Sequence, residues 1–103
     1  MFIIMWEFRV RQGQEIAFQQ AQGANGEWAR LFGRDARYLG TELLRDERDT
    51  HRYVTLDRWT SRAAYDAFRA QWQAEYRAID RAHESLTEQE ALLGMFTVGP
   101  ADE

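Results

Sequence analysis

The stretch that most constrains the fold is residues 52–86, where a predicted strand runs directly into a predicted helix. Alternating β-branched, aromatic and polar residues up to Trp59 favour a strand. Thr60 and Ser61 follow where a helix N-cap is expected, because a hydroxyl there accepts a bond from an unpaired backbone N–H. Apolar residues then recur every three or four positions, which predicts one long helix with a buried face. The members of that face are Tyr65, Phe68, Trp72, Tyr76, Ile79, His83 and Leu86.

Shorter periodic segments surround this stretch. Further strands are predicted at residues 2–10, 38–45 and 91–98. Helical segments are predicted at residues 14–22 and 27–32, separated by a turn that Gly23 and Gly26 favour. We expect Ile16, Phe18 and Ala21 to be the buried side chains of the first helix. The charged residues 46–50 predict a hairpin loop, and residues 87–90 match a capping box that predicts a short helical turn.

The resulting order of elements is β-α-β-β-α-β, which is typical of the ferredoxin-like α+β sandwich with a four-stranded antiparallel sheet. A chain of 103 residues fits one domain, which we place at residues 1–98, with a C-terminal tail at 99–103. Two helices cover only one face of such a sheet, yet several strands carry apolar residues on both faces. We therefore expect a homodimer in which two sheets pack together.

Composition excludes several classes of protein. All thirteen cations are arginines scattered among seventeen acids, and the net charge is −4, so no basic stripe exists for a nucleic-acid partner. The absence of cysteine excludes disulfides and thiol catalysis. The apolar run at residues 1–6 is too short for a signal peptide or a membrane span, so we expect a soluble, cytoplasmic protein with no membrane partner. No phosphate loop or metal-ligand spacing is present, so we expect neither cofactor nor metal.

A few polar and aromatic residues are candidates for chemistry. Thr55 and Asp57 share a strand face with Trp59, and a buried Asp57 would have a raised pKa and could act as a base toward a phenol. Alternatively, Asp57 pairs with a neighbouring arginine. His83 is either a base or a satisfied core or interface residue. Trp59 is either a pocket wall or core, and the Tyr65 phenol donates either to a substrate oxygen or to a backbone carbonyl.

The segment from Trp59 to Tyr65, W-T-S-R-A-A-Y, resembles the W-x-S-x-x-x-[YF] element of the antibiotic biosynthesis monooxygenase family. Element order and length extend the resemblance over nearly the whole chain. It implies a dimeric α+β barrel and a cofactor-independent monooxygenase that acts on a phenolic or polycyclic aromatic small molecule with dioxygen. In the family's quinone-forming oxygenases an Asn, a Trp and a Tyr surround the substrate. Trp59 and Tyr65 match the last two, and Thr55 stands in the place of the Asn.

The resemblance implies a role for each candidate residue. The walls of the substrate cleft would be Trp28, Phe32, Trp59 and Trp72. Tyr65 and Thr55 would donate hydrogen bonds, and Asp57 or His83 would be the base. The family's haem-degrading branch relies on an Asn, a Trp and a His that this chain lacks, which disfavours haem degradation. The alternative is a non-catalytic dimeric small-molecule-binding or stress-related protein of the same fold, which the missing Asn favours.

Overall fold

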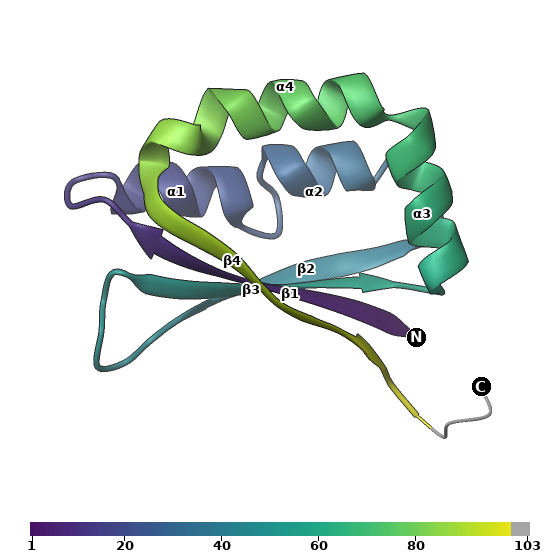
Figure 1. The fold of residues 1–103 in the computed structure, drawn as a ribbon, viewed down its shortest axis with the longest axis horizontal. Helices are drawn as coiled ribbons and strands as arrows, with labels where there is room; N and C mark the ends of the chain where they lie inside the picture. The colour runs from purple at the N-terminus through teal and green to yellow at the C-terminus, as the bar shows by residue number, and fades with distance from the viewer. Residues whose placement is uncertain (100–103) are drawn as a thin grey trace.

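The computed structural model describes residues 1–99 and has the ferredoxin-like α+β fold that the sequence predicts (Figure 1). Its elements are β1 (Phe2–Val10), α1 (Glu15–Gln22), α2 (Glu27–Phe32), β2 (Tyr38–Arg45), β3 (Arg52–Trp59), α3 (Arg62–Gln71), α4 (Gln73–His83), a short 3₁₀ turn η1 (Glu84–Leu86) and β4 (Thr87–Thr97). No helix within residues 1–99 is long and apolar enough to cross a membrane.

The four strands form one antiparallel sheet in the order β2-β3-β1-β4. β1 and β3 occupy the centre, and their register places Ile4 opposite Asp57 and Trp6 opposite Thr55. Burial alternates along β3, where Tyr53, Thr55, Asp57 and Trp59 are buried and the residues between them are not. This alternation confirms that one face of the central strands is covered, as the period-two pattern predicted.

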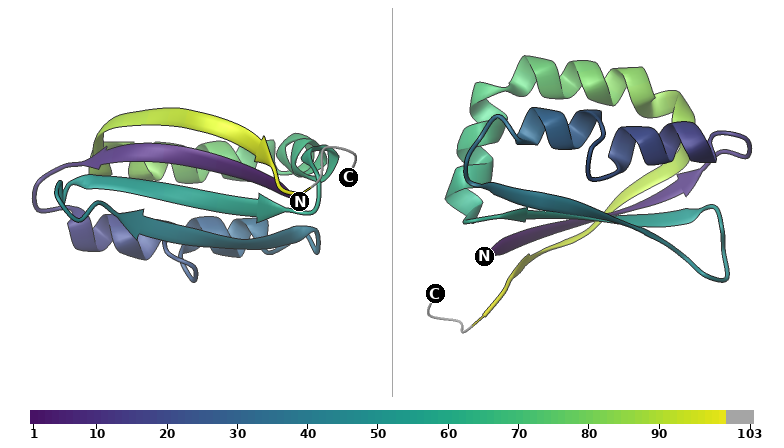
Figure 2. Two further views of the ribbon diagram at one scale, coloured as in Figure 1. Left: turned by 90° about the horizontal axis from the view of Figure 1, so that it is seen from below. Right: turned by 180° about the vertical axis from the view of Figure 1, so that it is seen from behind.

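All the helices lie on one face of the sheet, and the opposite face carries no helix (Figure 2). Exposed apolar side chains remain along the two edge strands or just beyond them: Leu39, Leu44, Leu92, Leu93, Met95, Phe96 and Val98. None of the residues of β4 is buried. An apolar surface of this kind is typical of a face that packs against another molecule.

The prediction of one long helix beyond Ser61 is wrong, because the chain bends at Trp72 and forms two helices, α3 and α4. Trp72 leaves helical geometry, with φ −109° and ψ 28°, although neither Gly nor Pro marks the bend. Ser61 does cap α3, since its hydroxyl accepts a hydrogen bond from the Ala64 N–H at 3.1 Å. The bend divides the predicted face: Tyr65 and Phe68 of α3 are buried, whereas α4 has no buried residue. As a result α3 packs tightly and α4 does not.

Other local predictions need correction. The capping-box residues 87–90 are not helical but begin β4, and the helical turn η1 comes before them. Ile16 is 72% exposed because α1 presents only Phe18 and Ala21 to the core. By contrast, the turn that Gly23 and Gly26 predict does separate α1 from α2, and the side chains of Trp28 and Phe32 after it are buried. Of the predicted tail at 99–103, residues 100–103 lie outside the described residues.

A β-bulge in β2 changes which side chains face the helices. The pairing with β3 shifts between Tyr38 and Gly40, and Gly40 has a φ of +124°, a conformation that side chains other than hydrogen disfavour. Tyr38 therefore pairs with Trp59, and Thr41 pairs with Asp57, so both side chains reach the covered face. In a regular strand without the bulge, Tyr38 and Thr41 would point to opposite faces. The bulge is what brings them together.

Candidate functional site

A cleft lies between the sheet and α4 and encloses about 550 Å³, including the part that is open to solvent. Seven elements contribute to its wall: β1, β3 and β4 from the sheet, and α1, α2, α4 and η1 from the helical layer. The lining residues are Trp6, Phe8, Phe18, Gln22, Trp28, Phe32, Thr55, Asp57, Tyr76, Asp80, His83, Glu84, Thr87 and Glu90. Aromatic side chains beside a small number of polar groups are typical of a site for a small organic molecule.

Aromatic side chains form most of the inner wall. The Trp28 and Tyr76 rings meet edge to face, with their centroids 4.8 Å apart, and the Phe32 ring lies 5.8 Å from that of Trp28. The indole Nε1 of Trp28 is buried and has no hydrogen-bond partner within residues 1–99. A planar aromatic ligand could therefore stack against this wall, and an acceptor atom on it could satisfy the indole N–H.

Asp57 supplies the buried carboxyl group of the cleft. Its side chain is 9% exposed, and its Oδ1 accepts a hydrogen bond from the Thr41 hydroxyl at 2.6 Å. Burial raises the pKa of Asp57 to about 6, and the bond from Thr41 opposes that rise. The predicted alternative, pairing with an arginine, is wrong, since no ion pair involves Asp57 in residues 1–99. A carboxyl group that titrates near pH 6 can act as a general base at neutral pH.

The outer part of the cleft carries the remaining titratable groups. His83 Nε2 lies 3.4 Å from Glu27 Oε1, a contact that joins the end of α4 to the start of α2. Partial burial and the charge of Asp80 raise the pKa of Glu90 across the opening from α4. Within residues 1–99 no three histidine or acidic side chains gather in a way that could hold a metal ion.

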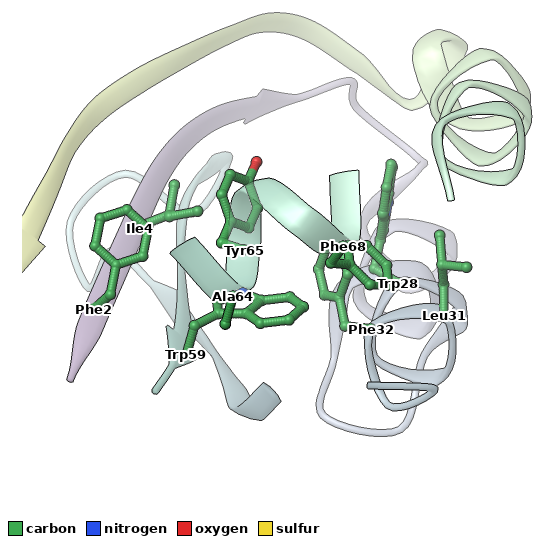
Figure 3. Packing of buried hydrophobic residues seen from close by; sticks show 9 residues of the cluster. All are labelled: Phe2, Ile4, Trp28, Leu31, Phe32, Trp59, Ala64, Tyr65 and Phe68. Carbon is green, nitrogen blue, oxygen red and sulfur yellow. The ribbon is translucent and has the colours of Figure 1, made fainter. Parts of the chain in front are cut away.

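The aromatic packing continues from Trp28 and Phe32 to the junction of β3 and α3, where Trp59, Tyr65 and Phe68 belong to the same buried cluster (Figure 3). Trp59 has 0% exposure, and its ring lies 5.1 to 5.7 Å from four neighbours. These neighbours are Phe32, Tyr38, Tyr65 and Phe68. The Tyr65 hydroxyl accepts a hydrogen bond from Arg69 Nη1 at 2.8 Å, and the same guanidinium lies 3.8 Å from the centre of the Tyr76 ring. Arg69 thus connects this junction to the wall of the cleft.

The structure brings five of the eight sequence-predicted site residues to the cleft: Thr55, Asp57, His83, Trp28 and Phe32. The other three do not line it. Trp59 and Tyr65 are packed in the closed junction, and Trp72 lies at the bend between α3 and α4 under the guanidinium of Arg34, 4.8 Å from the ring centre.

Sequence analysis missed several members of the cleft. Trp6 and Phe8 lie on the covered face of β1, and alternation along that strand could have identified them. Asp80 and Glu90 gave no such signal, since charged residues on a helix and on an edge strand are ordinarily solvated. Thr41 was missed because the bulge at Gly40 reverses the expected side of β2.

Comparison with known proteins agrees with this architecture. The family model for antibiotic biosynthesis monooxygenase matches residues 1–82, and the chain therefore belongs to this family. Its fold is similar to that of SnoaB, a cofactor-independent oxygenase from Streptomyces nogalater, with 23% identity and a TM-score of 0.72 over 97% of this chain and 94% of that chain. An asparagine-to-alanine variant of SnoaB gives 22% identity and a TM-score of 0.75, with coverage of 99% and 97%.

A third similar structure comes from Deinococcus radiodurans and is assigned to the same family. It has a TM-score of 0.77 at 13% identity and covers 98% of this chain and 95% of that chain. No curated protein matches the chain in sequence. At these identities the structural likeness establishes the fold, and the activity must be argued from the residues of the cleft.

Proposed function

We propose that the chain is a cofactor-independent monooxygenase that acts on a phenolic or polycyclic aromatic small molecule in the cleft beneath α4. The observation that carries this proposal is Asp57, a buried carboxyl group among aromatic side chains whose pKa is raised to about 6. At pH 7 most of the molecules would hold Asp57 ionised, and its surroundings would strengthen its attraction for a substrate proton.

In this reaction the substrate supplies the electrons. Asp57 removes a proton from a phenol or from an activated CH₂ group, and the resulting anion is rich enough in electrons to reduce dioxygen. For an anthrone, the CH₂ carbon loses two C–H bonds and gains a C=O bond, one oxygen atom of O₂ enters the quinone, and the other leaves as water. The atoms and electrons balance without an external reductant. The protein binds, desolvates and orients the substrate.

The cleft suits these tasks. Trp28 and Tyr76 offer aromatic surface on the helix side, and Trp6 faces them from the sheet. Thr55 is 2% exposed and lines the same cavity, so its hydroxyl can donate one hydrogen bond to a substrate oxygen where the matching family position carries an Asn. Burial of the substrate between these groups would exclude water from the anion that reacts with dioxygen.

Dioxygen uptake with a panel of anthrones and hydroquinones tests the proposal. We expect turnover by the purified, metal-free protein and a loss of about 100-fold or more in Asp57→Asn, the range typical of a removed general base. Asp66→Asn is the matched control, because Asp66 is an exposed aspartate of α3 that does not line the cleft. Uptake that Asp57→Asn leaves intact would remove the basis of the proposal.

We also propose that the functional unit is a homodimer formed through the open sheet face. Phe96 of β4 pairs with Ile3, and Leu44 of β2 pairs with Val54, so both exposed side chains lie on the open face and supply apolar surface that a second copy would bury. Light scattering at micromolar concentration should give twice the mass of one chain. A replacement of Leu44 and Phe96 by Glu should shift the mass toward the monomer, since buried unpaired carboxylates are costly.

A non-catalytic binding protein of the same fold is the second candidate. Two observations favour it: Thr55 replaces the family's Asn, and the two residues that match the family's Trp and Tyr, Trp59 and Tyr65, are packed in the closed junction. In that case a hydroxylated aromatic ligand binds the cleft, and no oxygen is consumed. Ligand affinity should then fall in a Trp28→Ala variant while uptake stays at background for every compound in the panel.

A further inference from the structure

Two side chains of β2 form a hydrogen-bonded chain that ends on Asp57. The Thr41 hydroxyl donates to Asp57 Oδ1 at 2.6 Å, and the Tyr38 hydroxyl forms a short hydrogen bond with the same Thr41 oxygen. A threonine hydroxyl has only one proton to donate. Because Thr41 donates it to the ionised Asp57, Tyr38 must be the donor in the other bond. Tyr38 therefore donates to Thr41, and Thr41 donates to Oδ1 of the carboxylate.

The other oxygen of Asp57, Oδ2, has no hydrogen-bond partner within residues 1–99, although the residue lines the cleft. The two oxygens thus have different surroundings. Oδ1 is held by Thr41 on the side of β2, and Oδ2 is available to a ligand. A carboxylate that is fixed at one oxygen presents the other in a defined direction, which is what transfer of a proton from a bound substrate needs.

This arrangement depends on the bulge. Gly40 adopts a φ of +124°, and the shift in register beside it places Tyr38 and Thr41 on the same covered face. Thr41 is 9% exposed, so water competes little for its hydroxyl. A bulge that aims a polar side chain into a buried position at the wall of a cleft is a feature that costs stability and is therefore expected to serve the site.

We propose that Thr41 is a positioning residue for Asp57, that Tyr38 fixes the direction of the Thr41 hydroxyl, and that together they keep Asp57 ionised with Oδ2 free to accept the substrate's proton. This inference rests on the proposed role of Asp57 as base. Burial favours the neutral carboxyl group, and the donated hydrogen bond favours the carboxylate, so the two effects together bring the pKa of Asp57 to about 6.

Other charged groups line the same cleft. They are Asp80 of α4, Glu84 of η1 and Glu90 of β4, but burial and the bond from Thr41 are what set the pKa of Asp57. His83 lines the cleft beside Glu27, and the Tyr76 phenol of α4 is neutral at physiological pH because burial raises its pKa. None of these groups changes in a Thr41 variant. Removal of the Thr41 hydroxyl therefore isolates the effect of the hydrogen bond.

The test is a titration of the Asp57 carboxyl carbon by NMR, in wild type and in Thr41→Val, Thr41→Ser and Tyr38→Phe. Thr41→Val keeps the shape of the side chain and removes the donor, so we expect the midpoint to rise by about one to two pH units. Thr41→Ser keeps the donor and should titrate close to the wild type. Tyr38→Phe should shift the midpoint in the same direction by a smaller amount.

The same variants are then compared in the pH dependence of kcat/KM for oxygen uptake, where the acidic limb should move together with the Asp57 midpoint. An unchanged midpoint in Thr41→Val overturns the inference, as does a Thr41→Ser variant that behaves like Thr41→Val. If Thr41→Val does not fold, Tyr38→Phe tests the chain from its outer end, and the absence of any shift overturns it. The titration does not depend on turnover. A shift without oxygen uptake therefore supports the positioning role and counts against the proposed oxygenase.

Discussion

Two aromatic regions lie beneath the helices of this small domain, and they differ in whether they are filled. At the junction of β3 and α3 the Trp59 ring packs against the rings of Tyr65 and Phe68, and all three side chains are buried. Beneath α4 a similar set of rings, including Trp28 and Tyr76, leaves a cleft with a buried carboxyl group. Aromatic content alone does not distinguish a core from a binding site.

What distinguishes them is how the covering helix meets the sheet. α3 begins directly after β3 at the Ser61 cap and packs Ala64, Tyr65 and Phe68 into the core. α4 starts after the bend at Trp72, has no buried residue, and contacts the rest of the protein through half-buried side chains. Because α4 does not pack as closely on the sheet as α3 does, a space remains beneath α4 that a ligand could occupy.

The largest expected difference between the regions is in stability. Trp59→Ala removes a side chain with 0% exposure and leaves a cavity, so the free energy of unfolding should fall by about 3–5 kcal/mol. Trp6→Ala, in the half-buried wall of the cleft, should cost less than half as much, because solvent or neighbouring side chains can fill the space. Urea denaturation of both variants measures this. Equal losses would show that the two regions are packed alike.

The next effect is a pH dependence of stability that comes from Asp57. Its pKa is about 6 in the fold, where burial favours the neutral form, and the value of an unperturbed aspartate is 3.8. The folded state therefore binds more protons than the unfolded state between these values, and the stability that Asp57 contributes at low pH is lost as the pH rises from about 4 to about 6. A difference of about two pH units corresponds to about 3 kcal/mol.

Asp57→Asn does not titrate, so its comparison with the wild type isolates this effect. The wild type should lose about 3 kcal/mol relative to Asp57→Asn between pH 4 and pH 7. The half-buried aspartates Asp35, Asp46 and Asp49, whose pKa values are lowered by hydrogen bonds, act in the opposite direction but are common to both proteins. Parallel stability curves for the two proteins would contradict a buried, ionisable Asp57.

A smaller effect is expected at the bulge that supports the cleft. Gly40→Ala places a side chain at a φ of +124°, so the free energy of unfolding should fall by about 1–2 kcal/mol. The cause is the backbone conformation and not crowding, because an added Cβ would meet nothing within 4 Å. Urea denaturation again provides the measurement. A variant as stable as the wild type would show that the bulge does not require glycine.

The smallest effect concerns the cap of α3. Ser61→Ala removes the acceptor of the Ala64 N–H, which should cost about 1 kcal/mol without a change in ligand affinity, since Ser61 does not line the cleft. Ser85→Ala, in the exposed turn η1, is the matched control and should be close to neutral. A loss of ligand affinity in Ser61→Ala would mean that the closed junction and the cleft are coupled.

Much of the fold follows from the sequence. The strand that ends at Trp59, the Ser61 cap and the periodic helix after it are local signals, and the βαββαβ order follows from them. The bend at Trp72 could not be predicted, because no Gly or Pro marks it and it depends on how the helix meets the sheet. A helical period indicates which side chains share a face, but it does not show where the helix leaves the core.

The candidate site was predicted only in part, for a related reason. Asp57 and Thr55 were identified as candidates because alternation along β3 places them on the same face as Trp59. Thr41 and Tyr38 could not be placed, because one extra residue at the Gly40 bulge moves them to the same side of β2. Trp59 and Tyr65 were predicted to be site residues from the family resemblance. A sequence motif does not specify whether its side chains face a cavity or pack against each other.

The most direct test of the contrast between the regions uses the four tryptophans as probes. Trp6 and Trp28 line the cleft, Trp59 is in the closed junction and Trp72 is at the bend. Their indole N–H signals can be assigned by Trp→Phe variants and followed by NMR during titration with a hydroxyanthraquinone, a product-like compound that cannot be oxidised by the proposed reaction. We predict shifts for Trp6 and Trp28, with little change for Trp59 and Trp72. A response led by Trp59 while Trp6 and Trp28 stay unchanged would contradict the assignment of the cleft beneath α4 as the functional site.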